Sequence, residues 1–366
     1  MRHSLYLDWY LHRPKVRFDF CSSGVTRLKY NLTLGEVDLS TNYAHGNPEA
    51  SELLARRYHV QPENVFISTE GASGQNTRII RHIAKRSKRR NEAIVEYPTY
   101  EPLLRKVQEH FPRVKRLERK EKEAYRLDID ALLKGISEKT ALLVLTNPHA
   151  PSGAISSKTE LEEIATIAQE QGFCILCDEI YAEFDRTAAP SIFSIDPEIG
   201  IVTTSFTKAY GLGGLKLGVA LAEKNRIDGL YKDVVNTVGN SPNIVQLIAA
   251  QLLRKDMETL EKHKQKWINL RDKTEKMLRE KGLEYFPSEM GITLWVDLPI
   301  KDTYRWISEH AIPHYGLAAV PGAFFLFRGS YKLTRSGKIR LGLGNINPDK
   351  PELGRAFETL ERALKR

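Results

Sequence analysis

Short apolar runs alternate with amphipathic stretches between residues 63 and 222. Strands are predicted at 64–69, 92–96, 141–146, 173–177, 201–204 and 217–221, and helices at 75–84, 100–110 and 157–171. Runs that are apolar throughout, such as 141–145, are typical of strands buried on both faces. Ser157 and Glu160 have the spacing of a capping box at the start of the third helix. Strands separated by helices indicate an α/β fold: a three-layer, doubly wound, mostly parallel sheet.

The pattern changes after Pro242. Residues 243–281 are predicted to be almost wholly helical, and a strand (292–297), a helix, a strand (338–343) and a final helix (351–364) follow. This order predicts a smaller C-terminal α+β domain. We expect an N-terminal arm over residues 1–40 that forms part of the small domain, a large domain over 41–240 and the small domain over 241–366.

The composition is that of an ordinary soluble globular protein, with 41% hydrophobic and 28% charged residues among 366. No apolar stretch approaches the length of a membrane span, and the N-terminus has no signal-peptide pattern. We therefore expect a cytoplasmic protein without a membrane partner. Three cysteines are too few for a disulfide scaffold. Cys174 and Cys177 fall in one strand and point to opposite faces, so no metal site is expected there.

A net charge of +9 raises the possibility of a nucleic-acid partner, and the densest basic run is 85–90. This run ends a predicted helix, where cations are favoured and a solvated basic surface is the simpler interpretation. No helix-turn-helix, zinc-finger or RNA-binding signature accompanies it. A nucleic-acid-binding regulator built on this fold stays a remote alternative, but the segments of the fold begin too early for an added DNA-binding domain. Attraction of an anionic cofactor or substrate is another use of the charge.

Polar and glycine-rich groups follow five of the predicted strands, where ligands bind in open parallel sheets. Residues 70–74 could bind phosphate through backbone N–H groups at a helix start, or could be an ordinary turn. Asp178 could pair with a buried cationic heterocycle, or could be a helix cap or structural ion-pair partner. Lys208 lies between hydroxyls and a glycine run after a buried strand. A lysine in such a place can anchor a carbonyl cofactor covalently.

Three motifs in order carry a family resemblance: Asn147-Pro-His-Ala-Pro-Ser-Gly153, Asp178-Glu-Ile-Tyr181 and Ser205-Phe-Thr-Lys208 with its glycine-rich tail. They resemble the core of the class I/II aminotransferases, which are fold-type I, pyridoxal-phosphate-dependent enzymes. Similar segments at 42–49 and 339–342 extend the resemblance over most of the chain. Each motif is moderately specific, and the ordered set is strongly so.

The resemblance implies a role for each matching residue. Lys208 would bond covalently to the cofactor aldehyde, Asp178 would keep the pyridine nitrogen protonated, and Tyr100 would stack on the ring. The phenolic oxygen of the cofactor would accept hydrogen bonds from Asn147 and Tyr181. The phosphate would be held by Ala72, Ser73, Ser205, Thr207 and Lys216.

The resemblance also implies substrate contacts and a homodimer. Arg340 would bind the substrate α-carboxylate as a two-pronged donor, and the backbone of Gly35 would meet the same group. Tyr43 would reach the phosphate in the neighbouring subunit. Lys216 stands where the family usually has arginine. Lysine keeps the positive charge but lacks the planar, two-pronged donor of a guanidinium group. His149 and Ala150 stand where the family often has asparagine, a change that can reshape the substrate pocket.

The implied reaction moves an amino group between an L-amino acid and a 2-oxo acid by ping-pong chemistry, with Lys208 moving the α-proton. Decarboxylases and β-lyases of the same fold share these motifs and stay open as alternatives. The Pro-Thr-Tyr element leans toward the histidinol-phosphate aminotransferase-like branch, which includes a phosphothreonine decarboxylase. Aromatic and aspartate-type transaminases are comparably supported. Candidates for the side-chain pocket are His149, Tyr315, Phe324, Phe325, Arg328 and Arg335.

Overall fold

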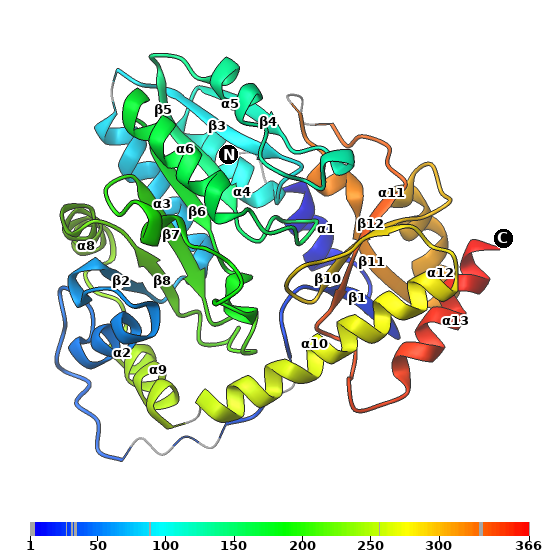
Figure 1. The fold of residues 1–366 in the computed structure, drawn as a ribbon. Helices are drawn as coiled ribbons and strands as arrows, with labels where there is room; N and C mark the ends of the chain where they lie inside the picture. Colours follow the sequence, from blue (N-terminus) through cyan, green and yellow to red (C-terminus); the bar gives the residue numbers. More distant parts are fainter. Residues whose placement is uncertain are drawn as a thin grey trace.

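Two β-sheets form the framework of the molecule (Figure 1). The computed structural model describes residues 4–26, 28–30, 32, 35–87, 89–255, 257–328 and 332–365. The larger sheet contains β2 (Val65–Ser68), β3 (Glu92–Tyr97), β4 (Arg113–Glu118), β5 (Thr140–Thr146), β6 (Cys174–Asp178), β7 (Gly200–Ser205) and β8 (Gly218–Leu221). Its order is β2-β8-β7-β6-β5-β3-β4. Among these described strands only β8 runs against its neighbours, so the predicted mostly parallel sheet is confirmed.

Successive residues of the central strands feed two separate hydrophobic layers, because side chains alternate across a sheet. Leu142 and Val144 of β5 pack under α3 (Gly71–Arg86), α4 (Glu101–His110) and α8 (Lys224–Val238). Leu143 and Leu145 pack on the other face, under α2 (Pro48–Tyr58), α6 (Lys158–Gln171) and α7 (Ile192–Ile195). The fold is therefore three layers deep, as the all-apolar strand runs predict.

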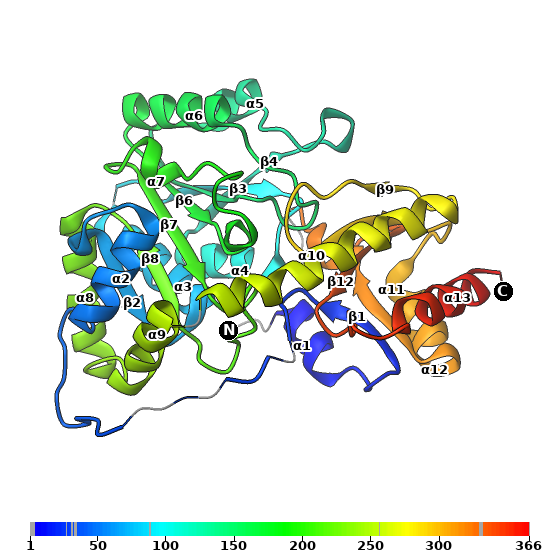
Figure 2. The same ribbon diagram turned by 60° about the horizontal axis from the view of Figure 1, so that its bottom comes forward.

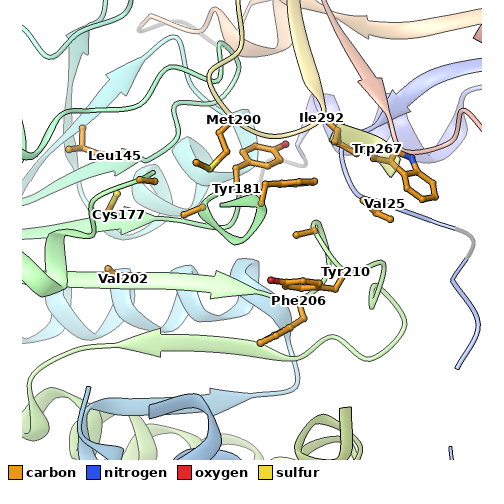
Figure 3. Packing of buried hydrophobic residues seen from close by; sticks show 14 of the residues in the cluster. Val25, Leu145, Cys177, Tyr181, Val202, Phe206, Tyr210, Trp267, Met290 and Ile292 are labelled. Carbon is orange, nitrogen blue, oxygen red and sulfur yellow. The ribbon is translucent and has the colours of Figure 1, made fainter. Parts of the chain in front are cut away.

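The cysteines of β6 obey the same alternation. Cys174 contacts the first layer, and Cys177 is buried in the second; both thiols are free. Figure 3 shows Cys177, Leu145 and Val202 on adjacent strands of the second layer. The predicted capping box is present as well, because Ser157 accepts a hydrogen bond from the Glu160 backbone N–H at 3.2 Å and Glu160 accepts one from that of Ser157 at 2.7 Å.

The smaller sheet has the order β1-β11-β12-β10-β9. Its strands are β1 (Phe18–Ser22), β9 (Tyr285–Phe286), β10 (Thr293–Asp297), β11 (Leu317–Pro321) and β12 (Lys338–Leu343). The sequence pattern predicts β10 and β12 but misses β1 and β11. Strand β1 comes from the N-terminal segment and pairs with β11 and β12.

Two helices lie between or across the sheets (Figure 2). The long helix α10 (Met257–Glu280) extends from beside the large sheet to the small one, where Trp267 Nε1 donates to the Leu343 carbonyl at 3.2 Å. The N-terminal helix α1 (Leu5–His12) lies between the two sheets. In the described part of the chain, no helix has the length and apolarity needed to cross a bilayer.

The remaining elements are short or peripheral. The other α-helices are α5 (Ile129–Gly135), α9 (Asn243–Lys255), α11 (Thr303–Trp306), α12 (Ile312–Tyr315) and α13 (Glu352–Leu364). Short 3-10 turns occur at Pro62–Asn64, Glu121–Glu123, Ala182–Phe184 and Gly322–Phe325, and a π-helical turn at Ile307–Ala311. Within the basic run at 85–90, Lys88 lies outside the described residues, and Arg90 bonds the carbonyls of Thr140, Gln171 and Gly172.

Candidate active site

A cavity of about 710 Å³ lies at the carboxyl ends of the large-sheet strands and reaches the small sheet. Parallel strands deliver their following residues to this one edge, so segments far apart in sequence meet there. The sequence-predicted site residues that line it are Ala72, Ser73, Tyr100, Asp178, Tyr181, Thr207, Lys208, Lys216 and Arg340.

Lys208 lies three residues beyond β7 at the wall of the cavity. Its Nζ donates a hydrogen bond to Ser23 Oγ at 2.8 Å. Burial, and then the positive charge of Arg340, lower the pKa of the amine to about 8, although Asp178 opposes the shift. A larger share of this amine than of an ordinary lysine is therefore neutral near pH 7, the form that attacks a carbonyl carbon.

Asp178 is the last residue of β6 and is buried. Its Oδ2 accepts from Asn76 Nδ2 at 2.7 Å, and its Oδ1 accepts from the backbone N–H of Ile180 at 3.1 Å. Burial raises the pKa of Asp178, and these two donors partly offset that effect. A carboxylate held in this way can pair with a cation that enters the cavity.

Part of the cavity is a space at the start of α3, lined by Gly71, Ala72, Ser73 and Lys216. Gly71 begins the helix with φ +67°, and its N–H donates to the Lys216 carbonyl at 2.7 Å. Among the described residues, a Cβ at Gly71 would come within about 4 Å of two atoms, Lys216 Cδ at 3.9 Å and Ser205 Oγ at 4.0 Å. No side chain in that part of the chain caps this helix. Unpaired N–H groups, the helix dipole and the Lys216 ammonium together favour a phosphate.

Arg340 projects from β12 and is 3% exposed. Its Nη2 donates to the Cys21 carbonyl at 2.6 Å and to Tyr6 Oη at 3.4 Å. Its Nε is buried and has no hydrogen-bond partner in the part of the chain that the structure describes. Buried donors are normally satisfied, and a carboxylate that enters the cavity can satisfy this one.

Aromatic side chains form one wall of the cavity. Tyr100 meets Tyr6 edge to face, with ring centroids 5.5 Å apart. Tyr181 lies beside Met290 in the core view of Figure 3, and it lines the cavity. Burial raises the pKa of Tyr181, so its phenol stays protonated at neutral pH. The wall offers flat apolar surface and a hydroxyl, which suits an aromatic ring with a polar edge.

Two residues predicted to touch the cofactor do not line the cavity. Asn147 Oδ1 accepts from the Ser156 N–H, and its Nδ2 donates to the Pro190 carbonyl, each at 2.9 Å. Its amide is therefore occupied in bracing its own turn. Ser205 Oγ donates to the Leu217 carbonyl at 2.6 Å and lies behind Gly71.

Gly35 lies apart from the cavity, contrary to the prediction. It is exposed, and a Cβ added to it would meet no atom of the described residues within 4 Å. The segment that follows β1 lies beside Lys208 instead: a Cβ at Gly24 would come 3.2 Å from Lys208 Cδ and 3.0 Å from the Thr207 carbonyl. The available signal was the apolar alternation of Phe18 and Phe20 before a small-residue turn, a pattern that can end a strand at a site.

Of the other predicted residues, some line the cavity and others lie outside it. Tyr43 lies outside the cavity, half-buried in the segment before α2. Phe325 is the one side-chain-pocket candidate that lines the cavity among the described residues. His149 is instead buried, bonding Ser152 Oγ at 2.7 Å and the Pro98 carbonyl at 3.0 Å. Cavity-lining residues that the sequence did not single out include Tyr6, Leu7, Tyr10, Ser23, Gly24 and Asn76.

Comparison with known proteins agrees with this geometry. The family model "Aminotransferase class I and II" matches residues 29–350. Two curated relatives are each 28% identical over 255 residues: an aspartate aminotransferase of Pyrococcus abyssi and an aromatic-amino-acid aminotransferase of Thermococcus litoralis. Each match covers 67% of this chain and 61% of the relative.

A solved structure has the same fold. The aspartate aminotransferase of Thermotoga maritima superposes with a TM-score of 0.79 at 19% identity, covering 91% of this chain and 85% of that one. The family match spans nearly the whole chain, from before α2 to the start of α13. The chain therefore belongs to the class I and II aminotransferase family.

Proposed function

We propose that this protein is a pyridoxal-phosphate-dependent aminotransferase that moves an amino group between an L-amino acid and a 2-oxo acid. One observation carries the proposal: an amine of lowered pKa (Lys208), a buried carboxylate (Asp178) and a buried guanidinium with an orphan donor (Arg340) converge on one cavity. Members of this family use pyridoxal phosphate. Its aldehyde, ring nitrogen and phosphate match the amine, the carboxylate and the space at Gly71.

The residues that would hold the cofactor follow from this match. The N–H groups of Ala72 and Ser73, together with Thr207 and Lys216, would bind the phosphate. Asp178 would pair with the ring nitrogen, and Tyr100 would stack on the ring. Tyr181 would donate its phenolic proton to the ring oxygen. Ser205 and Asn147 would act indirectly. Ser205 holds the backbone behind the phosphate site through its bond to the Leu217 carbonyl, and Asn147 holds its own turn through its bond from the Ser156 N–H.

Each of the protein's own groups would carry one part of the catalysis. The bound cofactor supplies a carbonyl that bonds the substrate nitrogen and a ring that accepts electrons. Arg340, whose Nε has no partner among the described residues, would hold the substrate carboxylate. Lys208 Nζ takes the proton from the substrate α-carbon, a transfer that its pKa of about 8 favours near neutral pH. Tyr6 and Tyr100 keep water from the reacting atoms.

The donor specificity follows the cavity lining and the relatives. The part of the cavity near α1 and α4 is lined by Leu7, Tyr10 and Leu103, with Lys106 beside them. The relatives act on aspartate and on aromatic amino acids, by their names. We propose donors from these two classes. A panel of L-amino acids with 2-oxoglutarate tests the assignment: new glutamate supports it, whereas carbon dioxide or ammonia without glutamate would assign the decarboxylase or β-lyase alternative.

Replacing Arg340 by glutamine is expected to lower kcat/KM for every amino donor by about 10²–10³-fold, because a desolvated charge partner of the carboxylate is lost. The amount of bound cofactor should be unchanged, since Arg340 faces the substrate. Steady-state kinetics checks the first result and a spectrum the second. Arg305→Gln is the control, because Arg305 is exposed and pairs with Glu309 on the surface. A loss of less than threefold would remove Arg340 from the substrate site.

We also propose a homodimer in which Tyr43 reaches the phosphate of the neighbouring subunit, and a cytoplasmic location. Tyr43 is half-buried and away from its own chain's cavity, which leaves it available to a second copy. Light scattering should give about twice the 41.7 kDa of one chain. A monomer that is fully active would contradict the shared site. Division into an arm to 40, a large domain to 240 and a small domain stays our proposal for the domains.

A further inference from the structure

A hydrogen-bonded row of three side chains runs beneath the cavity. Thr203 Oγ1 donates to Asn76 Oδ1 at 2.6 Å, and Asn76 Nδ2 donates to Asp178 Oδ2 at 2.7 Å. Thr203 is fully buried and Asn76 is 4% exposed. The parallel register of β6 and β7 sets Asp178 opposite Thr203, and Asn76 descends onto both from α3.

The direction of the hydrogen bonds in this row favours the charged form of Asp178. The Thr203 hydroxyl donates to the amide oxygen, so the amide presents its N–H to the carboxylate. A reversed amide would place two oxygens 2.7 Å apart, which is tolerable only if Asp178 carried a proton. The row therefore favours the anion of Asp178 at a place where burial opposes it.

Helix α3 serves two ends of the cavity at once. Its first residues form the space at Gly71, and Asn76 follows little more than one turn later. We propose that Asn76, held by Thr203, is a positioning residue that keeps Asp178 ionised and aimed into the cavity. A cationic ring nitrogen there would depend on it. This inference rests on the proposed function, because it concerns how the cofactor ring stays protonated.

The other titratable groups that face Asp178 stay in place in the test. They are Lys208, Tyr100, Tyr181 and Cys177, with Glu179 adjacent in the chain. The test variants change only Asn76 and Thr203, neither of which titrates. A change in the pH dependence would therefore come from the hydrogen bonds to Asp178 and not from a lost charge.

The test measures the affinity of the apoprotein for pyridoxal phosphate as a function of pH, by equilibrium dialysis. Wild type should lose affinity as the pH falls through the range where Asp178 gains a proton. In Asn76→Ala we expect the midpoint of this loss to move upward by about one to two pH units, since a hydrogen bond to the charged form is gone. Thr77→Val, next on the same helix, half-buried and without a bond to Asp178, should leave the midpoint unchanged.

A second pair of variants guards against misfolding of Asn76→Ala. Thr203→Val should move the midpoint in the same direction by a smaller amount, and Thr203→Ser, which keeps the hydroxyl, should restore it. A midpoint equal to wild type in both Asn76→Ala and Thr203→Val would overturn the inference, as would an affinity lowered equally at every pH. Failure of the wild-type protein to bind pyridoxal phosphate would instead contradict the proposed function.

Discussion

Alanine at position 208 is expected to lower amino-transfer turnover by at least about 10⁴-fold and to leave the folded state as stable as wild type. The activity falls because one amine serves as covalent anchor and as the group that moves the α-proton. Stability is kept because the Lys208 amine bonds Ser23 alone among the described side chains, and burial and Arg340 already disfavour its charge. Single-turnover kinetics and denaturant unfolding measure the two effects.

Lys224→Ala is the matched control for this substitution. Lys224 is exposed on α8 and pairs with Asp228 at 3.2 Å, so its loss should change neither rate nor stability. Adding a small primary amine such as methylamine should restore part of the Lys208→Ala activity, because it can enter the vacated space and carry the proton. Turnover within tenfold of wild type in Lys208→Ala would remove this residue from the chemistry.

Replacing Glu183 by glutamine is expected to cost about 3–5 kcal/mol of folding free energy, the effect of breaking a buried ion pair. Glu183 has no exposed surface. It accepts hydrogen bonds from Arg57 at 2.9 Å, Arg186 at 3.0 Å, Tyr58 at 2.9 Å and Thr204 at 3.1 Å. Burial alone would raise the pKa of Glu183, but the two arginines outweigh it and the pKa is lowered.

The amide of the variant keeps the shape and loses the charge, which removes the anion that the two partly buried guanidinium groups share. Arg186 keeps its ion pair with Glu179 at 3.3 Å. Denaturant unfolding checks the size of the loss. Glu162→Gln supplies the comparison, because Glu162 is about half exposed on α6 and its pair with Lys158 is worth well under 1 kcal/mol. If Glu183→Gln lowers the free energy of unfolding no more than Glu162→Gln does, Glu183 and its hydrogen-bond partners contribute little to stability.

Glu183 and its hydrogen-bond partners also help to hold the loop that carries Lys208. Tyr210 lies two residues after Lys208, and its hydroxyl bonds the Glu183 carbonyl at 3.2 Å and Glu261 of α10 at 3.0 Å. Tyr210 stacks near Phe206, as Figure 3 shows, at a centroid distance of 5.3 Å. The loop that carries Lys208 is therefore fixed at its far side by buried contacts rather than by the cavity.

The strand and helix alternation of the large sheet could be predicted because its strands are buried on both faces. Strand β4 escaped prediction for the opposite reason: it is an edge strand of mostly charged residues, Arg113 to Glu118, with mainly exposed or half-buried side chains. Helix α1 was also missed, although Tyr6 on it reaches Arg340. Its sequence is short and apolar on more than one side, so its periodicity is weak.

The site residues that could be predicted are those whose backbone position alone brings them to the cavity, such as Asp178 at the end of β6. Gly35 and Gly24 both follow plausible segments, and only the long-range pairing of β1 with β11 and β12 decides between them. The role of Asn147 depends on where its amide hydrogen bonds go, which a sequence motif does not specify. The contacts of Asn76 with Asp178 and Thr203 depend on how α3 packs on β6 and β7, which the sequence pattern does not specify.

Amino-group transfer is tested most directly by following an isotopically labelled amino group. The purified protein, loaded with pyridoxal phosphate, is incubated with a labelled L-amino acid and unlabelled 2-oxoglutarate, and the products are analysed by mass spectrometry. We expect the label in newly formed glutamate, one for each donor consumed, and none of this transfer in Lys208→Ala. Label released as free ammonia, or carbon dioxide formed without labelled glutamate, would contradict the proposed aminotransferase.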